Sequence, residues 1–465
     1  MAVSNPVRSL FEDAQSQQYS LHERHLNEQL VRVLRTTGYD RVYARGEGAY
    51  LWDTEGQRYL DLLAGFGVHA FGRNHPVMKE RLKQAIDEDL PNLVQLDCPA
   101  LAGAFASRLA PRMPNGLNRF FFCNSGTEAI EGAIKMSRAT TGRAEALYTS
   151  SAYHGLSLGA LALNGCDAFR ENFGPLPNAT EIPFDDLGAL EKALSTKRYA
   201  CFVVEPIQGK GVHIPSDDYL PEASRLCKKH GTLLVIDEVQ TGIGRTGKFL
   251  AVEHWPGTEP DIVTMAKALS GGFIPVGAIA TSDRVFARTF PSMERAVVHS
   301  TTFGRNALAM VAGITSLEIL DEGDYIRKSA ERGAELLAGL RDAIGDDEFV
   351  KDVRGKGLMV GVEFGPPKSM KLKLSWGALE SANKGLFAQL IVIPLFRDHH
   401  MLTQVAGNAS HVVKMIPPLT LSSENVSEIV AAYAEVVEAT HRVPGAIWDL
   451  GKTLASAAMR TRKAG

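Results

Sequence analysis

The sequence predicts an α/β protein, in which a large, doubly wound and mostly parallel sheet domain is joined to a small α+β terminal domain. Two aliphatic runs, 232–236 and 261–266, are too apolar to alternate, which is typical of strands buried on both faces of a parallel sheet. Between residues 119 and 281, runs of this kind alternate with amphipathic helical segments. That alternation indicates βαβ units, so we expect one parallel sheet over this part of the chain.

The elements of the large domain follow in order. Expected strands cover 119–123, 146–148, 201–204, 232–236 and 261–266, and expected helices cover 77–87, 99–110, 220–230 and 307–320, with a further helix after residue 128. Before them, residues 1–35 form a polar arm with one helix at 26–34, and short strands at 42–44 and 50–53 flank turn-forming residues.

After residue 281 the pattern changes, and from about residue 325 it is that of an α+β domain. We expect helices at 326–343, 376–388 and 424–440, and strands at 350–353, 358–364, 390–393 and 412–415. The short strands near residue 50 have no place in the parallel sheet, so they are assigned to this small domain. The expected domain limits are 1–70 for a segment joining the small domain, 71–324 for the large domain and 325–465 for the small domain with a tail.

Composition excludes several classes of protein. With 465 residues the chain has room for about two to three domains. Lys and Arg total 50 against 53 Asp and Glu, which argues against a nucleic-acid partner. Five scattered cysteines without CxxC or metal-ligand spacing fit the reduced thiols of a cytosol. Because there is no apolar run of about 18 residues and no signal-peptide pattern in the first 25 residues, we expect a cytoplasmic protein.

Two charged residues stand where a parallel sheet binds ligands. Asp237 and Lys267 each follow a buried strand, and ligands of open α/β sheets collect at that carboxyl edge. Partial desolvation lowers the pKa of a lysine there and makes it a nucleophile toward carbonyls. An acid beside it could hold a protonated pyridine nitrogen, and pyridoxal phosphate requires this pair. Taken alone, a lysine after a strand is more often a solvated loop charge, so the pair needs a phosphate site.

A candidate phosphate site lies between the strand 119–123 and the next helix. Ser125, Gly126 and Thr127 could offer hydroxyl and backbone N–H donors to an anion at the positive helix end, although serine and threonine are also common simple N-caps. Tyr153 and His154 follow another strand and could stack on a ring, or could be packed loop side chains.

The segment 242–247 matches the pattern G-x-G-x-x-G of dinucleotide-binding proteins. In that fingerprint the glycines follow the strand at once and open a helix. Here residues 237–241 intervene, and no helical stripe follows. We therefore expect no dinucleotide site at this segment.

Together these motifs resemble the class III aminotransferases, which belong to fold type I of the pyridoxal-phosphate enzymes. The resemblance covers roughly residues 50–441 and is nearest to the ornithine, acetylornithine and putrescine aminotransferase branch. It implies an enzyme that moves an amino group from an amine donor to a keto acid or aldehyde. The motifs that carry it are 124–129, 153–155, 205–208, 236–242, 245–247 and 266–269.

The resemblance implies a role for each residue around the cofactor ring. Lys267 would form the Schiff base and then carry the proton, and Asp237 would pair with the ring nitrogen. Gln240 would bind the ring oxygen O3′. Val239 would pack on one face of the ring and Tyr153 on the other.

Further implied roles concern the phosphate and the neighbourhood of the ring. Ser125, Gly126 and Thr127 would hold the phosphate, and Thr302 would reach the phosphate of a partner subunit, which implies a homodimer with shared sites. His154 would lie beside Tyr153, and Glu205 would support these residues from behind.

Two positions depart from the branch, which usually carries a glutamate gate and an arginine clamp for an α-carboxylate. Lys210 and Lys414 stand there instead, and a lysine cannot make the bidentate fork of an arginine. We therefore expect these lysines on the substrate side of the site. Alternatives are a lipid-linked or polyol aldehyde acceptor of the hopanoid type, or an aminomutase or decarboxylase on the same fold.

The tail after residue 445 has an apolar stripe of Ile447, Leu450, Leu454 and Ala458, followed by Arg460, Arg462 and Lys463. One interpretation is a helix docked on its own domain or on the dimer partner. The alternative is weak contact of this stripe with an anionic membrane surface.

Overall fold

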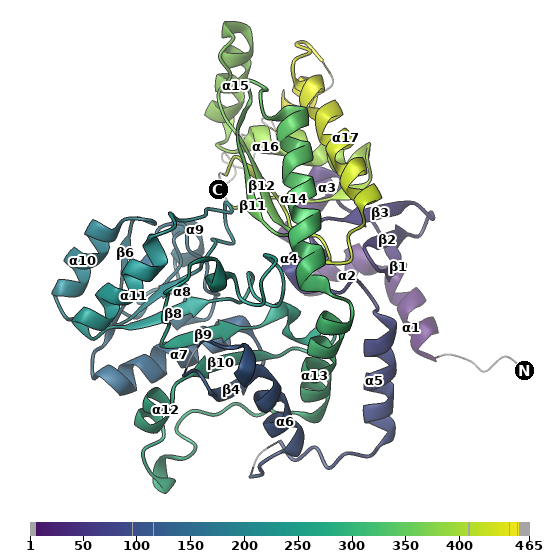
Figure 1. Ribbon diagram of the computed structural model, residues 1–465. Helices are drawn as coiled ribbons and strands as arrows, with labels where there is room; N and C mark the ends of the chain where they lie inside the picture. The colour runs from purple at the N-terminus through teal and green to yellow at the C-terminus, as the bar shows by residue number, and fades with distance from the viewer. Residues whose placement is uncertain are drawn as a thin grey trace, which may run out of the picture.

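Three sheets organise the chain in the computed structural model, which describes residues 6–94, 96–114, 116–407, 410–445, 447–452 and 454. A seven-stranded sheet forms the larger lobe, and two four-stranded sheets lie in the smaller lobe above it (Figure 1). The expected α/β class, with a large mostly parallel sheet, is confirmed.

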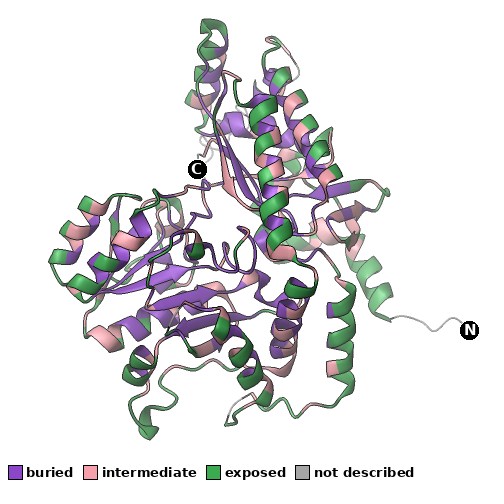
Figure 2. Cartoon of the chain, in the orientation of Figure 1, coloured by how far each residue is buried: buried purple, intermediate pink, exposed green. Residues whose placement is uncertain are grey.

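The central sheet has the strand order β4-β10-β9-β8-β7-β5-β6. Its strands are β4 (Arg119–Cys123), β5 (Glu145–Thr149), β6 (Ala179–Ile182), β7 (Tyr199–Val204), β8 (Leu233–Asp237), β9 (Ile262–Met265) and β10 (Gly277–Thr281). Only β10 is antiparallel to its neighbours, β4 and β9. Every residue of β7, β8 and β9 is buried, and the sheet is accordingly the most continuously buried part of the lobe (Figure 2).

Burial on both faces explains why these strands do not alternate in polarity. Leu233 and Val235 pack into one apolar cluster with α7 (Gly126–Thr141), whereas Leu234 and Ile236 pack into the cluster on the opposite face. Each face therefore requires its own set of apolar side chains.

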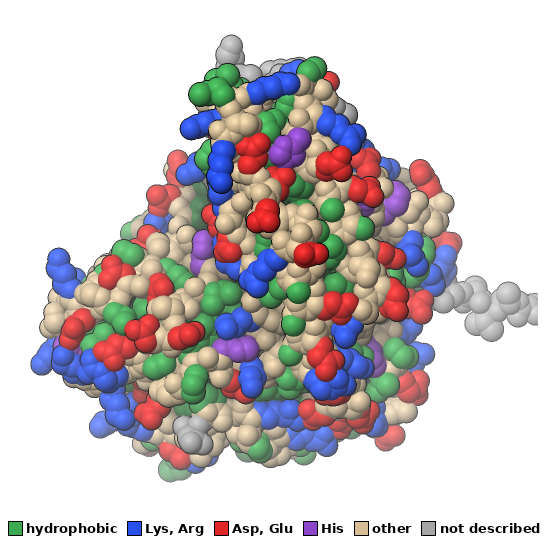
Figure 3. All heavy atoms as spheres, turned by 45° about the horizontal axis from the view of Figure 1, so that its top comes forward, with side chains coloured by type: hydrophobic (Ala, Val, Ile, Leu, Met, Phe, Trp, Pro, Cys, Tyr) green, Lys and Arg blue, Asp and Glu red, His purple; other side chains and the backbone are tan. Residues whose placement is uncertain are grey.

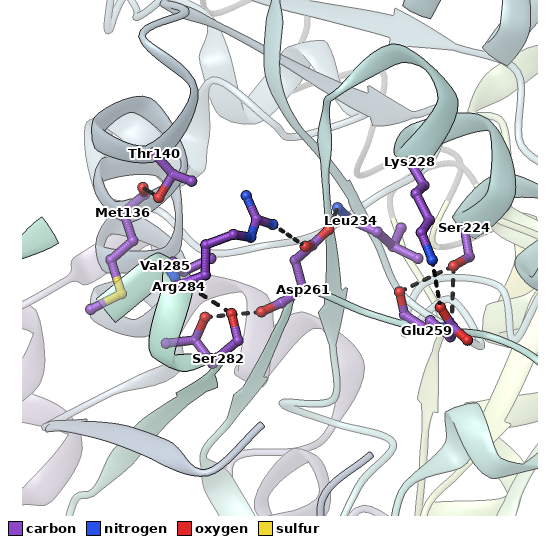
Figure 4. Close-up of polar contacts among 11 residues, drawn as sticks. Met136, Thr140, Ser224, Lys228, Leu234, Glu259, Asp261, Ser282, Arg284 and Val285 are labelled. Carbon is purple, nitrogen blue, oxygen red and sulfur yellow. Dashed lines mark hydrogen bonds and ion pairs between the residues drawn. The ribbon is translucent and has the colours of Figure 1, made fainter. Parts of the chain in front are cut away.

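The start of β9 is fixed by polar contacts on both sides (Figure 4). Asp261 accepts hydrogen bonds from Leu234 N at 3.0 Å and from Arg284 Nη2 at 2.8 Å. Just before it, the carbonyl of Glu259 accepts from Ser224 Oγ at 3.1 Å. These contacts hold β9 in register with β8, and therefore fix the position of the residue that follows β9.

The smaller lobe combines both ends of the chain. One sheet contains β1 (Tyr43–Glu47), β2 (Tyr50–Asp53), β3 (Arg58–Asp61) and β13 (Met401–Leu402), and the other contains β11 (Val350–Lys356), β12 (Met359–Phe364), β14 (Gln404–Val405) and β15 (Val412–Met415). The pairing of β3 with β13 supports the assignment of the early strands to the small domain, while the limits 1–70, 71–324 and 325–465 stay predictions.

The helices cover these sheets from outside. In the larger lobe they include α5 (Pro76–Asp87), α6 (Ala100–Leu109), α10 (Leu187–Ser195), α11 (Tyr219–His230), α12 (Asp283–Thr289) and α13 (Ala307–Glu322). Helices α14 (Tyr325–Ile344) and α17 (Ser423–Thr440) lie side by side on the smaller lobe (Figure 1). The amino-terminal arm consists of α1 (Pro6–Gln15), α2 (Gln18–His25) and α3 (Glu28–Thr37).

One expectation for the small domain is wrong. The expected helix at 376–388 and strand at 390–393 are replaced by two helices, α15 (Met370–Ala382) and α16 (Leu386–Arg397). All but one of the residues 386–396 are buried, so α16 is apolar around its whole circumference and lacks the polar face that marks a helix in sequence. Its apolar run therefore has the same pattern in sequence as a buried strand.

The tail docks on the small domain over the residues described. Ile447, Trp448 and Leu454 are buried, and Trp448 Nε1 donates to the carbonyl of Thr440 at 2.7 Å. The indole lies 6.2 Å from the ring of Phe349. This agrees with the docked interpretation for the described part of the stripe, in which Ile447 and Leu454 are buried and Leu450 is half-buried. Ala458, Arg460, Arg462 and Lys463 lie outside the described residues.

The surface and the helices bear on possible partners. On the face shown in Figure 3, acidic and basic side chains lie interspersed, as the near balance of 53 acidic and 50 basic residues predicts. Within the described ranges, none of the helices combines the length and the apolar character needed to cross a bilayer.

We expect Trp448→Ala to lower the free energy of unfolding by about 3 kcal/mol, because it removes a buried indole from the cluster around Phe349. Urea unfolding followed by circular dichroism measures the change. Lys452→Ala, on the exposed side of the same tail, serves as the control and should shift the midpoint little. Equal midpoints for the two variants would contradict the docking of the tail.

Candidate active site

The candidate site lies where β7, β8 and β9 end. Asp237 is the last residue of β8 and is paired in register with Thr264 of β9. Lys267 comes three residues after Thr264, at the start of the short helix η3 (Lys267–Ser270), and its φ is +47°. A left-handed backbone is uncommon for a lysine and is found where a structure must aim a side chain. The two residues that the sequence singled out therefore share one edge of the sheet.

Asp237 is buried and held by three donors. His154 Nδ1 lies 2.7 Å from Oδ2, while Val239 N and Thr264 Oγ1 lie 3.0 and 3.4 Å from Oδ1. Burial by itself would lower the pKa of His154, but the hydrogen bond to Asp237 and the charge of that carboxylate outweigh it, so the pKa of His154 is raised. His154 thus belongs behind Asp237, and its buried Nε2 has no hydrogen-bond partner within the described ranges.

Lys267 has the electrostatic setting of a nucleophile. Burial of its amine lowers the pKa, and the charges of Asp237 and Glu205 oppose that effect only in part. A larger fraction of the amine is then neutral near neutral pH and able to attack a carbonyl. The expected desolvation at a strand end is therefore present.

Glu205, at the end of β7, organises the neighbouring loops. Its carboxylate accepts from Gly209 N at 2.8 Å and from Tyr153 N at 3.1 Å. Burial raises the pKa of Glu205, partly offset by the nearby His154. The structure therefore gives Glu205 a positioning role, because it fixes the backbone of Tyr153.

The amino end of α7 has features both of a simple N-cap and of an anion site. Ser125 is the N-cap and accepts from Glu128 N at 3.3 Å, which leaves its own O–H free to donate. A Cβ on Gly126 would lie 2.7 Å from Val239 Cγ1, so only glycine lets the helix end approach Val239 this closely. Backbone N–H groups here remain available to an anion.

Thr127 has partners that the sequence did not reveal. Its Oγ1 lies 2.6 Å from Ser157 Oγ, and Ser157 Oγ in turn donates to Glu131 Oε1 at 2.6 Å. Because an ionised carboxylate only accepts, the Thr127 hydroxyl must donate to Ser157. Thr127 therefore offers its backbone N–H, rather than its hydroxyl proton, to a bound anion in this arrangement. Residues spaced about 30 apart give no local signal of such a chain.

Two lysines from different lobes complete the site. Lys414 of β15 is buried and donates to the carbonyl of Gly209 at 2.6 Å and to Gln240 Oε1 at 3.2 Å. Burial, reinforced by the charge of Lys267, lowers the pKa of Lys414 to about 7. Lys210 Nζ lies 4.1 and 4.9 Å from the ring centroids of Phe169 and Tyr153. Both expected substrate-side lysines are thus near the candidate site.

Gln240 and Thr302 have different surroundings from the other candidates. Gln240 Nε2 donates to the carbonyl of Phe66 at 3.1 Å, so both ends of its amide are engaged. Thr302 is exposed, while the adjacent Thr301 accepts from Asn124 Nδ2 at 2.7 Å. The loop of Thr302 is therefore attached beside the end of β4 but leaves Thr302 facing outward.

The glycine-rich segment 242–247 lies at the junction of the lobes. It does not open an α-helix, since the first helical element after it is the short 3-10 helix η2 (Ala251–His254). Its buried Arg245 donates to the carbonyls of Leu358, at 3.1 Å, and Pro417. Burial lowers the pKa of the Arg245 guanidinium to about 9. This structural use of Arg245 could not be read from the pattern of glycines.

Comparison with known proteins agrees with this geometry. A family model described as aminotransferase class III matches residues 35–437. The aminotransferase PigE of Serratia sp. (strain ATCC 39006) is 33% identical over 450 residues, which cover 90% of this chain and 53% of PigE. The chain thus spans about half the length of that relative. The acetylornithine aminotransferase of Methanopyrus kandleri is 36% identical over 399 residues, covering 85% of this chain and 94% of the relative.

Solved structures give the same picture. The ornithine aminotransferase from Toxoplasma gondii ME49 superposes with a TM-score of 0.81 at 26% identity, over 94% of this chain and 99% of that one. A second Toxoplasma gondii structure, described as having partial occupancy of PLP at its active site, also has a TM-score of 0.81 at 26% identity, over 95% and 100% of the two chains.

The buried Lys414 predicts a pH-dependent stability. Its pKa lies at about 7 in the folded protein against 10.5 as the ordinary value, so the unfolded chain binds more protons between these pH values. The free energy of unfolding, compared with that of Lys414→Met, should therefore rise with pH, by on the order of 2–3 kcal/mol between pH 7 and 9.5. Urea unfolding at a series of pH values measures this. A difference independent of pH would contradict a depressed pKa.

Proposed function

The chain belongs to the class III aminotransferases, and we propose that it catalyses pyridoxal-phosphate-dependent transfer of an amino group from an amine donor to a keto acid or aldehyde. The observation that carries the proposal is the meeting of Lys267 and Asp237 at one buried edge, beside the free amino end of α7. Members of the family use pyridoxal phosphate, and one solved relative is described with PLP at its active site.

The residues present fit this cofactor. Its aldehyde needs an amine with a lowered pKa, which Lys267 has, and its ring nitrogen needs an acid, which Asp237 can provide. Its phosphate needs donors at a helix end, which Ser125, Gly126 and Thr127 can supply. When bound, the cofactor supplies an electron sink for the pair left on the substrate carbon.

The chain's own residues then divide the remaining work. Asp237, oriented by His154, stabilises positive charge at the ring nitrogen, and the free Lys267 amine moves the proton to and from the substrate carbon. Val239 and Tyr153 would pack on the two faces of the ring and exclude water from them. Gln240, now bonded to Phe66 and Lys414, would turn toward the ring oxygen. Lys210 and Lys414 lie on the substrate side.

An aminomutase or a decarboxylase could use the same Lys267 and Asp237. A single experiment separates them from an aminotransferase. The purified protein is incubated with single amines, without a carbonyl acceptor, and its absorbance near 400–430 nm is followed. Stoichiometric bleaching of the chromophore by an amine indicates transfer of the amino group to the cofactor. A mutase would instead turn over its amine under these conditions, because it needs no external acceptor.

We also propose a homodimer in which Thr302 reaches the phosphate site of the partner subunit. The loop around Thr302 carries exposed Met293, Val297 and Phe303, and Arg305 joins it to the segment of the fully exposed Leu96 through the carbonyl of Asp97. Exposed apolar residues gathered in this way are typical of a surface that is covered in an assembly. The five free cysteines support a reducing compartment such as the cytoplasm.

We expect Lys267→Ala to abolish turnover, because the variant lacks both the covalent anchor and the proton carrier. Borohydride reduction of the wild-type protein followed by peptide mapping should place the pyridoxyl group on Lys267. The circular dichroism spectrum of the variant controls for folding. A label on a different lysine would refute the assignment.

The dimer is tested with Val297→Asp, which places a charge in the exposed apolar loop. Sedimentation should show a dimer for the wild type and a shift toward monomer for the variant, with activity falling in proportion because the shared site is lost. Asp283→Asn, on the exposed ion pair with Arg119, is a control that should keep the wild-type mass. A fully active wild-type monomer would rule the dimer out.

A further inference from the structure

The loop 205–213 holds Lys210 in a fixed position. Glu205 accepts from Gly209 N at 2.8 Å, and Lys414 donates to the carbonyl of Gly209 at 2.6 Å. Gln208 donates through Nε2 to the carbonyl of Ser150 at 2.7 Å. The backbone immediately before Lys210 is thus bonded to the central sheet and to the smaller lobe.

The backbone after Lys210 is held in the same way. Arg354 of β11 donates from Nη2 to the carbonyl of Gly211 at 2.7 Å and from Nε to that of Val212 at 2.9 Å. Gly211 and Val212 both have positive φ, of +80° and +50°. A non-glycine residue persists in this conformation only where its surroundings enforce it. The loop backbone is therefore held rigidly on both sides of Lys210.

The amine of Lys210 has no hydrogen-bond acceptor in the part of the chain that the structure describes. Lys210 Nζ is buried and lacks a hydrogen-bond partner among the described residues. The rings of Phe169 and Tyr153, at 4.1 and 4.9 Å, attract the ammonium but accept none of its three protons in an ordinary hydrogen bond. Burial lowers the pKa of Lys210 accordingly. An unpaired buried ammonium is costly unless an anion joins it.

The other charges of the site are already engaged. Lys414 donates to two oxygens, and each carboxylate oxygen of Glu205 accepts a backbone N–H. Lys267 is reserved for the cofactor. Among the residues that the structure describes, Lys210 is consequently the cation of this site that lacks a hydrogen-bond acceptor, and the aromatic rings beside it offer an apolar wall next to the charge.

We propose that Lys210 is the receptor for a carboxylate of the substrate, so that the enzyme takes amines or carbonyl compounds that carry a carboxylate next to an apolar segment. The carboxylate would replace the missing acceptor of Nζ, and the apolar segment would lie on Tyr153 and Phe169. The inference rests on the proposed transamination. It also disfavours simple diamines, because their second ammonium group would meet Lys210.

Binding of a non-reactive probe tests the receptor without turnover. Hexanoate and its uncharged counterpart hexanamide are titrated into the holoenzyme by calorimetry. The wild type should bind hexanoate at least tenfold more tightly, and Lys210→Met should reduce this preference at least tenfold, whereas Lys210→Arg should retain most of it. Lys192→Met, on the exposed face of α10, is the matched control and should keep the preference. Equal binding of the two probes to the wild type, or a preference that survives in Lys210→Met, would overturn the proposal.

A kinetic experiment separates recognition from a structural role. Ornithine and putrescine differ by one carboxylate, and the half-reaction with each is followed by loss of the cofactor absorbance. In Lys210→Met the ratio of kcat/KM for ornithine over putrescine should fall at least tenfold, through KM. A ratio unchanged from the wild type would refute recognition. If no amine bleaches the wild-type holoenzyme, the proposed transamination fails, while the hexanoate titration still decides the receptor.

Discussion

The parallel pairing of β8 with β9 is the constraint on which the site depends. In this ladder Asp237 of β8 lies opposite Thr264 of β9, and Lys267 follows Thr264 by three residues. A shift of register by one residue would turn every side chain of β9 to the opposite face. The apolar clusters on both sides of the sheet exclude that shift, and Asp261 fixes the start of the strand. Packing in the core thus determines which charges meet at its edge.

The site concentrates charge that water would normally stabilise. Four basic or acidic groups, Lys267, Lys414, Glu205 and His154, have pKa values displaced by burial and by one another. His154, Glu205 and Lys414 are held by hydrogen bonds to Asp237 or to backbone groups, and the charges of Asp237 and Glu205 act on Lys267, which keeps the cost of burial moderate. Such displacement is common where proton transfer is carried out.

The sequence was informative where one strand or helix carried the signal. The buried strands, the helix after Ser125 and the pair Asp237 and Lys267 could all be predicted, because each depends on local apolar runs and on the edge rule for parallel sheets. The helix α16 could not, because a helix buried on all sides has no periodic pattern. The roles of Arg245 and Lys414 depend on contacts between the two lobes, and the residues in contact lie 113 to 205 positions apart in the chain. Spacing in sequence does not encode such contacts.

The lobes are joined by cations that donate to main-chain carbonyls: Arg245 to residues 358 and 417, Arg354 to residues 211 and 212, and Lys414 to residue 209. A carbonyl oxygen is present whatever side chain a residue carries. Each of these bonds therefore depends on the identity of a single residue, and substitution at the accepting position leaves the acceptor in place. Mutational drift can then alter the loops around the substrate, and with them the specificity, while the arrangement of the two lobes is inherited unchanged.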